Sequence, residues 1–174
     1  RHYDKPLTNI VYMGMGEPLL NYKNVVTSID RISADFGLGM SPKRITLSTA
    51  GISKMIHRMG DEKVKFRLAL SLHAANDEKR SKIMPINEQN SLDSLIDSMN
   101  HFYHATGNRV TYEYIIFKDF NDSIEDADEL AAFVRKPPGR VNIIEYNPID
   151  DGEFEQASPE KVDAFAAHLE RKRV

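Results

Sequence analysis

The sequence alternates between strand-like and helix-like patterns five times, and this alternation most constrains the fold. Apolar, β-rich stretches predict strands at residues 9–15, 44–48, 66–72, 110–117 and 141–146. A helical pattern follows each one, over residues 23–36, 52–59, 91–104, 123–134 and 158–169. Five βα units in succession predict an α/β fold of parallel strands with right-handed crossovers, either a barrel or a doubly wound sheet.

The length of the chain limits which of these folds it can complete. A full eightfold barrel takes about 250 residues, and this chain has 174. It contains no linker, low-complexity tract or second composition regime, so the sequence predicts a single domain over residues 1–174. We expect a partial (β/α) barrel of about five units. The chain begins at Arg1 rather than Met, and we expect it to be an internal piece of a longer protein.

Charge and composition argue against some classes of partner. The chain carries 23 basic and 26 acidic side chains, a formal net charge of -3. Proteins that grip nucleic acid through their own phosphate contacts are usually basic, so this chain alone is a poor candidate for such binding. No apolar run approaches the roughly 20 residues of a membrane span, and the first nine residues do not resemble a signal peptide. We expect a cytoplasmic protein without membrane contact.

Glycine and polar residues gather where the predicted strands end. Because the carboxyl ends of parallel strands lie at one rim, where such folds bind their ligands, we expect these residues to surround one site. Taken singly, each group also fits a helix cap or a turn. The five groups are Gly14, Gly16 and Glu17; Ser48 and Thr49; Ser71 and His73; Lys118, Asn121 and Asp122; and Asn147 and Pro148.

The first of these groups, in the stretch NIVYMGMGEPLLN, indicates a cation rather than a phosphate. A dinucleotide-binding loop requires a third glycine where this chain has Leu19, and Glu17 would repel an anion. A carboxylate beside exposed backbone suits a positively charged ligand. The structural alternative is a tight turn, with glycines at positive φ and Pro18 preset for it.

Several motifs, in order at the predicted strand ends, resemble one enzyme family. They are GMGEPLLN, LSTAGI, SLHA followed by IMPIN, TYEYIIFKDFND and YNP. This ordered set is similar to the radical S-adenosylmethionine (SAM) methyltransferases that methylate carbon 2 of an adenosine in 23S ribosomal RNA and in tRNA. The resemblance covers almost the whole chain. Pro18 after the Gly-Glu pair favours this group over relatives that methylate carbon 8 of the same adenosine.

The resemblance implies a set of SAM-binding residues. Gly16 and Glu17 would meet the amino group of SAM, and Ser48 would lie near its methionine end. Asn147 would reach the nucleoside end. Ser71, Leu72 and His73 would line the flank of the ligand.

The same resemblance implies a 4Fe-4S cluster held by a CxxxCxxC loop and a further cysteine that carries the methyl group. The chain has no cysteine at all, so it offers no thiolate for such a cluster. We expect both cysteine-bearing segments to lie outside residues 1–174, leaving this chain with no catalytic residue of its own. The intact enzyme would act on 23S rRNA and tRNA and would need a protein that reduces the cluster.

Other functions remain open at this stage, among them a radical SAM enzyme of another reaction class. A phosphate-binding barrel lyase should carry a lysine within a strand, whereas Lys63 and Lys65 precede a predicted strand and Lys118 follows one. A non-catalytic module that has kept the fold is a further alternative.

Two charged or metal-binding patterns favour an ordinary structural interpretation. His101 and His104 stand three residues apart on a predicted helix, but no third metal ligand is evident, which favours surface histidines. The charged run at residues 77–82 is typical of a solvated helix face, although it could also contact RNA.

Overall fold

The five predicted strands form one parallel sheet in chain order. The structure is a computed structural model that describes residues 7–150 and 152–174. The strands are β1 (Ile10–Tyr12), β2 (Ile45–Thr49), β3 (Arg67–Ser71), β4 (Val110–Ile116) and β5 (Gly139–Glu145), arranged β1-β2-β3-β4-β5. A doubly wound sheet would reverse its strand order at a switch point. The unbroken order confirms the predicted partial barrel of βα units.

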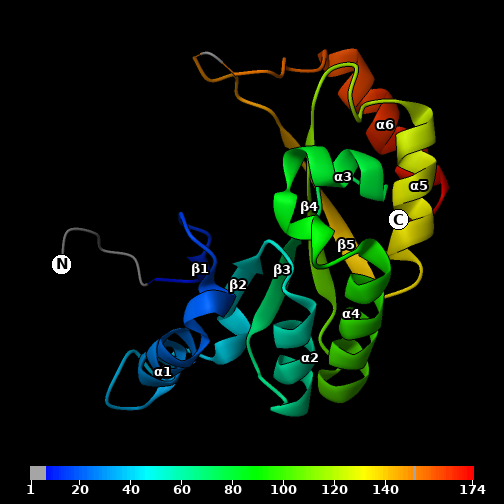
Figure 1. The fold of residues 1–174 in the computed structure, drawn as a ribbon. Helices are drawn as coiled ribbons and strands as arrows, with labels where there is room; N and C mark the ends of the chain where they lie inside the picture. The colour runs from blue at the N-terminus through cyan, green and yellow to red at the C-terminus, as the bar shows by residue number, and fades with distance from the viewer. Residues whose placement is uncertain (1–6, 151) are drawn as a thin grey trace.

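Helices connect each strand to the next, as the alternation predicts. They are α1 (Tyr22–Ser33), α2 (Ser53–Asp61), α3 (Asp77–Ile83), α4 (Leu92–Thr106), α5 (Ile124–Val134) and α6 (Pro159–Arg171), with short 3-10 turns η1 (Pro18–Asn21), η2 (Pro42–Arg44) and η3 (Pro85–Glu88). Figure 1 shows the strands side by side, with α2 and α4 against one face of the sheet and α5 and α6 beside β5. None of the helices in the described residues is both long and apolar enough to cross a bilayer.

The hydrophobic core lies between the sheet and these helices. Alternate strand residues point into it and stack across the register, as where Leu47 pairs with Leu68 and Leu70 with Tyr112. All four are fully buried, together with helix residues such as Phe102. The intervening strand residues face the other side, where Ser48, Ser71 and Ile115 are only partly buried. The sequence therefore forms one packed face and one open face.

Two predicted boundaries differ from the structure by three residues, and the others differ by at most two. The first strand ends at Tyr12 instead of residue 15, because Met13 and Gly14 already turn into the loop toward η1. The first helix ends at Ser33, and exposed Phe36 lies in the turn that follows. Most of the stretch tested for a signal peptide, residues 1–6, lies outside the described residues.

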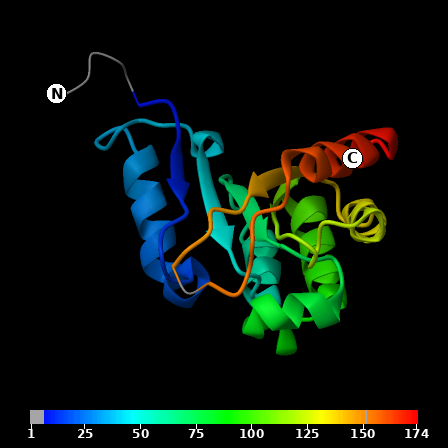
Figure 2. The same ribbon diagram turned by 90° about the horizontal axis from the view of Figure 1, so that it is seen from above.

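The connection between β5 and α6 returns over the sheet. Figures 1 and 2 both show this segment, drawn in orange, reaching from the end of β5 back toward the β1 side. It is held near its end by an antiparallel bridge between Phe117 and Gln156 and by a hydrogen bond from Lys118 N to Glu155 O of 3.0 Å. The open face of the sheet is thus bordered by this segment at its carboxyl-end rim.

Candidate functional site

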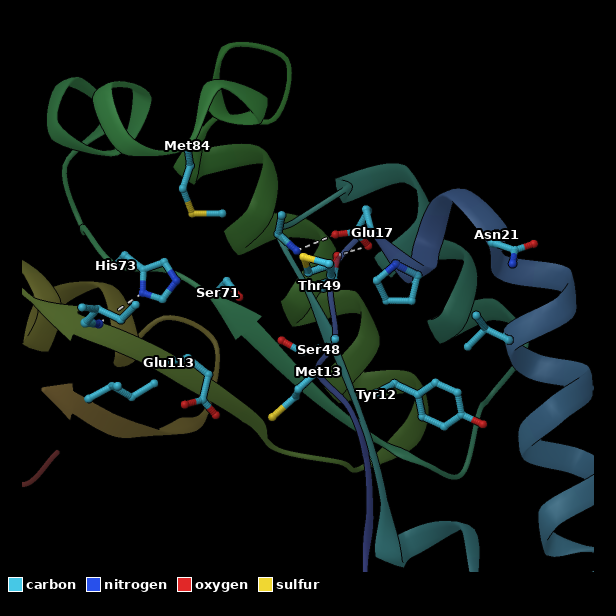
Figure 3. A pocket seen from close by; sticks show the side chains of 18 of the residues that line it. Tyr12, Met13, Glu17, Asn21, Ser48, Thr49, Ser71, His73, Met84 and Glu113 are labelled. Atoms are coloured by element: carbon cyan, nitrogen blue, oxygen red, sulfur yellow. Dashed lines mark hydrogen bonds between the residues drawn. The ribbon is translucent and has the colours of Figure 1, made fainter. Parts of the chain in front are cut away.

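A cleft of about 970 Å³ opens at the carboxyl ends of β1 to β5. Five of the seven predicted site residues line it: Gly16, Glu17, Ser48, Ser71 and His73. Figure 3 shows Glu17 and His73 toward opposite ends of the cleft, with Ser48 and Ser71 between them. The cleft has the size of a typical small-molecule site and combines a few polar groups with an apolar lining.

The apolar part of the lining comes from the loop after β1, from α1, from the end of α3 and the residue after it, and from β4 and β5. Its members are Met13, Met15, Val25, Ile83, Met84, Ile115 and Ile144. Thioether and branched side chains of this kind can pack against a flat or aliphatic ligand surface. None of the lysines in the described residues lines the cleft, so the barrel-lyase alternative lacks its expected base there.

Glu17 is held in place by three hydrogen bonds. Its Oε1 accepts from Leu19 N at 2.9 Å and from Thr49 Oγ1 at 2.8 Å, and its Oε2 accepts from Ala50 N at 2.7 Å. The bonds to Thr49 and Ala50 tie the loop after β1 to the end of β2. A carboxylate offers about four acceptor positions, so Glu17 retains capacity for one further donor, on the Oε2 side.

The loop before Glu17 brings backbone to the surface of the cleft. Gly16 has φ +93°, in the region that favours glycine, and a Cβ placed there would meet no atom within 4 Å. Because a side chain would fit in this open space, glycine is needed here for its positive φ and not to avoid a steric clash. The turn interpretation of this stretch therefore holds, and the same turn places Glu17 in the lining of the cleft.

His73 closes the opposite end of the cleft as a neutral ring. Its backbone has φ 56°, a left-handed conformation uncommon for a residue other than glycine. Its Nδ1 accepts a hydrogen bond of 3.1 Å from Ile115 N, which places the proton on Nε2. Burial, helped by the nearby charge of Arg80, lowers the pKa of His73 to about 4. At neutral pH the ring is thus an uncharged donor at Nε2.

The remaining two predicted residues lie apart from the cleft lining. Leu72 is fully buried, and its backbone is engaged on both sides: its N donates to Glu113 O at 3.0 Å and its O accepts from Arg80 Nε at 3.2 Å. Asn147 is exposed on the segment after β5 and is not among the residues that line the cleft. The backbone of Leu72 therefore helps to hold the end of β3 in place, and Asn147 lies outside the lining of the cleft.

Arg80 is the main feature of the site that the sequence interpretation missed. The run at residues 77–82 does form a helix, α3, but its Arg80 is fully buried instead of solvated. Its guanidinium donates to Ala50 O at 2.7 Å, Ser71 O at 3.1 Å and Leu72 O at 3.2 Å. Burial lowers the pKa of Arg80 to about 10, which leaves it charged at neutral pH. One cation thus joins the ends of β2 and β3.

A second layer of hydrogen bonds fixes Arg80 itself. Its Nη1 donates to Asn87 Oδ1 at 2.7 Å, and Asn87 Nδ2 donates to Asp77 Oδ1 at 2.8 Å. Asp77 Oδ1 also accepts from Leu92 N at 3.0 Å, at the start of α4. The SLHA and IMPIN motifs are therefore physically linked, since Asn87 of the second motif orients the arginine that holds the end of the first.

Glu113 is a second residue that the sequence interpretation passed over. It lies in β4 on the open face, lines the cleft, and is only 8% exposed. Its Oε2 accepts from Asn142 Nδ2 of β5 at 2.6 Å. The signal was available, because an acidic residue between Tyr112 and Tyr114 must point away from the core that both tyrosines enter.

Comparison with known proteins agrees with this architecture. No family model matches the chain. A probable dual-specificity RNA methyltransferase RlmN from Cytophaga hutchinsonii is 58% identical over 99% of this chain and 47% of the relative. Another from Flavobacterium psychrophilum is 54% identical over 97% of this chain and 49% of the relative. This chain is a homologue of the RlmN-type RNA methyltransferases.

A solved structure supports the same conclusion. The crystal structure of a radical SAM methyltransferase from Sphaerobacter thermophilus is 36% identical, with a TM-score of 0.94 over 98% of this chain and 50% of that chain. The chain thus spans about half the length of the RlmN-type relatives it matches. The resemblance inferred from the sequence motifs is confirmed.

Proposed function

We propose that this chain is the SAM-binding core of a radical SAM RNA methyltransferase that methylates carbon 2 of adenosine in 23S rRNA and tRNA. The cleft supports the proposal most directly, because it places the Glu17 carboxylate and the uncharged Nε2 donor of His73 at opposite ends of one small-molecule site. SAM, which supplies the methyl group, carries an ammonium, a carboxylate and a nucleoside that require both kinds of partner.

Different residues of the cleft would contact different parts of the ligand. Glu17 would accept from the amino group on its free Oε2 side, beside the exposed backbone of Gly16. Ser48 and Ser71 would hydrogen-bond the polar part of the ligand along the open face, and His73 would donate from Nε2 to an acceptor. The roles of Leu72 as flank and of Asn147 at the nucleoside end remain predictions.

The chain does not fit an iron–sulfur cluster. Cluster iron is held by thiolates, and no cysteine is present. We propose that the cluster and the methyl-carrying cysteine belong to the length of the relatives that this chain does not span. The intact enzyme would then work in the cytoplasm, with a partner protein as reductant and RNA as substrate.

Calorimetric titration of SAM into the purified chain tests the cofactor site. Losing the charge-assisted bond to the ammonium in Glu17→Gln should weaken binding by about 10- to 100-fold, roughly 1.5–3 kcal/mol. Thr49→Val is the matched control, because it removes a structural partner of Glu17 and keeps the carboxylate.

The two variants separate a binding role from a structural one. If Thr49→Val weakens SAM as much as Glu17→Gln does, Glu17 acts only as a tie between two loops. Asn147→Ala tests the nucleoside end in the same titration. For the intact enzyme, detection of 2-methyladenosine in 23S rRNA and tRNA by nucleoside mass spectrometry tests the activity, and its absence would contradict the reaction proposed.

A further inference from the structure

A second cluster of ligand-type side chains lies on the helix layer, formed by His57 and Asp61 of α2 and His101 of α4. His101 Nε2 lies 2.7 Å from Asp61 Oδ1, and His57 Nδ1 lies 3.3 Å from Asp61 Oδ2. The ligand atoms of the three residues all lie within 4.8 Å of one another. The sequence pattern showed no third ligand near His101 and His104 and favoured ordinary surface histidines. In the structure the side chains that meet His101 come from the neighbouring helix.

The packing of α2 against α4 creates this arrangement. Figure 1 shows the two helices side by side. Gly60 is buried at their contact, and a Cβ there would lie 2.6 Å from His101 Cδ2. The missing side chain therefore lets the His101 ring approach α2. His57 and Asp61 are four residues apart on α2, the spacing that places two side chains on the same helix face.

The geometry of the rings presents two nitrogens to one place. The imidazoles of His57 and His101 stack with centroids 3.7 Å apart and planes 3° from parallel. Each ring then directs one nitrogen to a different oxygen of the same carboxylate, that of Asp61. In a tetrahedral site with bonds of about 2.0–2.1 Å, two nitrogen ligands lie roughly 3.3 Å apart. Because an ion lies in the plane of each imidazole that binds it, the two nearly parallel rings must rotate toward each other to bind one ion, and the exposed side chain of His57 leaves space for that rotation.

The surroundings leave room for a further ligand. A cavity of about 640 Å³ adjoins the cluster and is lined by His57, Asp61, Ser94 and Asp97, among others. The side chains of His57, Asp61 and His101 are 46%, 59% and 35% exposed, so an ion could enter from solvent. Arg58 lines the same cavity but is paired with Glu62 at 2.7 Å, which offsets its charge.

We propose that His57, Asp61 and His101 bind a divalent transition-metal ion, with Zn²⁺ as the class representative, and thereby cross-link α2 to α4. Two imidazoles and one carboxylate suit Zn²⁺, Co²⁺ or Ni²⁺ rather than Mg²⁺ or Ca²⁺, which prefer oxygen ligands. Three protein ligands leave the fourth position for water from the adjoining cavity. This site lies on the helix layer and is independent of the SAM cleft.

Titration of ZnCl₂ into tag-free, metal-stripped protein, followed by calorimetry, tests the site. We expect one equivalent to bind, and each of His57→Ala, Asp61→Asn and His101→Ala to weaken binding at least about 10-fold. His104→Ala is the matched control, because His104 lies on the same helix one turn beyond His101 and outside the cluster. The visible absorption of bound Co²⁺ should likewise be lost in the ligand variants and kept in the control.

A variant that keeps all three ligands guards against misinterpretation through misfolding. Gly60→Ala should displace the His101 ring and weaken Zn²⁺ binding without removing a ligand, while circular dichroism reports whether each variant remains folded. The proposal is overturned if wild-type protein binds no Zn²⁺, or if the folded ligand variants bind it as tightly as His104→Ala does.

Discussion

Replacing Arg80 with methionine should lower the free energy of unfolding by about 3–5 kcal/mol. The variant keeps most of the buried volume but removes the donor of four hydrogen bonds, to the carbonyls of Ala50, Ser71 and Leu72 and to Asn87 Oδ1. Leu72 O keeps its hydrogen bond from Ala74 N, so three acceptors are left without a donor, which would cost about 3–9 kcal/mol at roughly 1–3 each. Removing a desolvated charge offsets several kcal/mol of this cost, so the net loss of unfolding free energy is roughly 3–5 kcal/mol.

Urea denaturation at pH 7, monitored by circular dichroism, measures this loss. Lys82→Met is the matched control: it lies on the same helix, and its ion pair with Glu78 is exposed, at 60% and 82% for the two side chains. Its effect should stay within about 0.5 kcal/mol. If Arg80→Met is as stable as Lys82→Met, the buried guanidinium does not hold the strand ends together.

Three further predictions rest on single contacts. His73→Asn should make the free energy of unfolding fall less between pH 6.5 and 4. The pKa of His73 is lowered from 6.5 to about 4 in the folded state, so its neutral ring favours the fold above this window and that contribution is lost as the pH falls through it. Denaturation across this range should show a difference of at most about 3 kcal/mol between variant and wild type. Gly139→Ala places a Cβ 2.2 Å from Tyr112 and should lower the unfolding free energy by about 1–3 kcal/mol, whereas Gly14→Ala, which meets nothing within 4 Å, should not; equal effects would contradict the packing. Ser123→Ala breaks the capping box of α5 and should cost about 1 kcal/mol, measured as a lower Tm; an unchanged Tm would show that the cap is redundant.

The strands and helices could be predicted because each βα unit carries its own period and caps. Ser158 and Pro159 mark the start of α6 in the sequence, and both occupy the predicted cap and first-turn positions. The end of the first strand is harder to predict, since Met13 and Met15 continue the apolar run after the hydrogen-bonded strand has ended at Tyr12. Apolar composition alone does not tell a strand from the loop that lines a cleft.

Some residues of the candidate site could likewise be predicted from the sequence, and others could not. Gly16, Glu17 and His73 could be found because glycine and polar residues at strand ends are a local signal. Arg80 could not, because its neighbours in sequence are charged and exposed, and its burial depends on carbonyls contributed by β2 and β3. The His101 cluster was missed for a related reason: contacts between α2 and α4 are set by packing, which a single helix pattern does not report.

The ties along the rim described above join neighbouring strands, one pair at a time. Glu17 links β1 to β2 through Ala50 N, Arg80 links β2 to β3, and His73 links β3 to β4 through Ile115 N. Because each of these ties joins only two neighbouring strands, the loss of one leaves the hydrogen bonds of the other two in place. The Glu17 end and the His73 end of the cleft therefore depend on different hydrogen bonds, and a substitution at one end should leave the contacts of the other end in place.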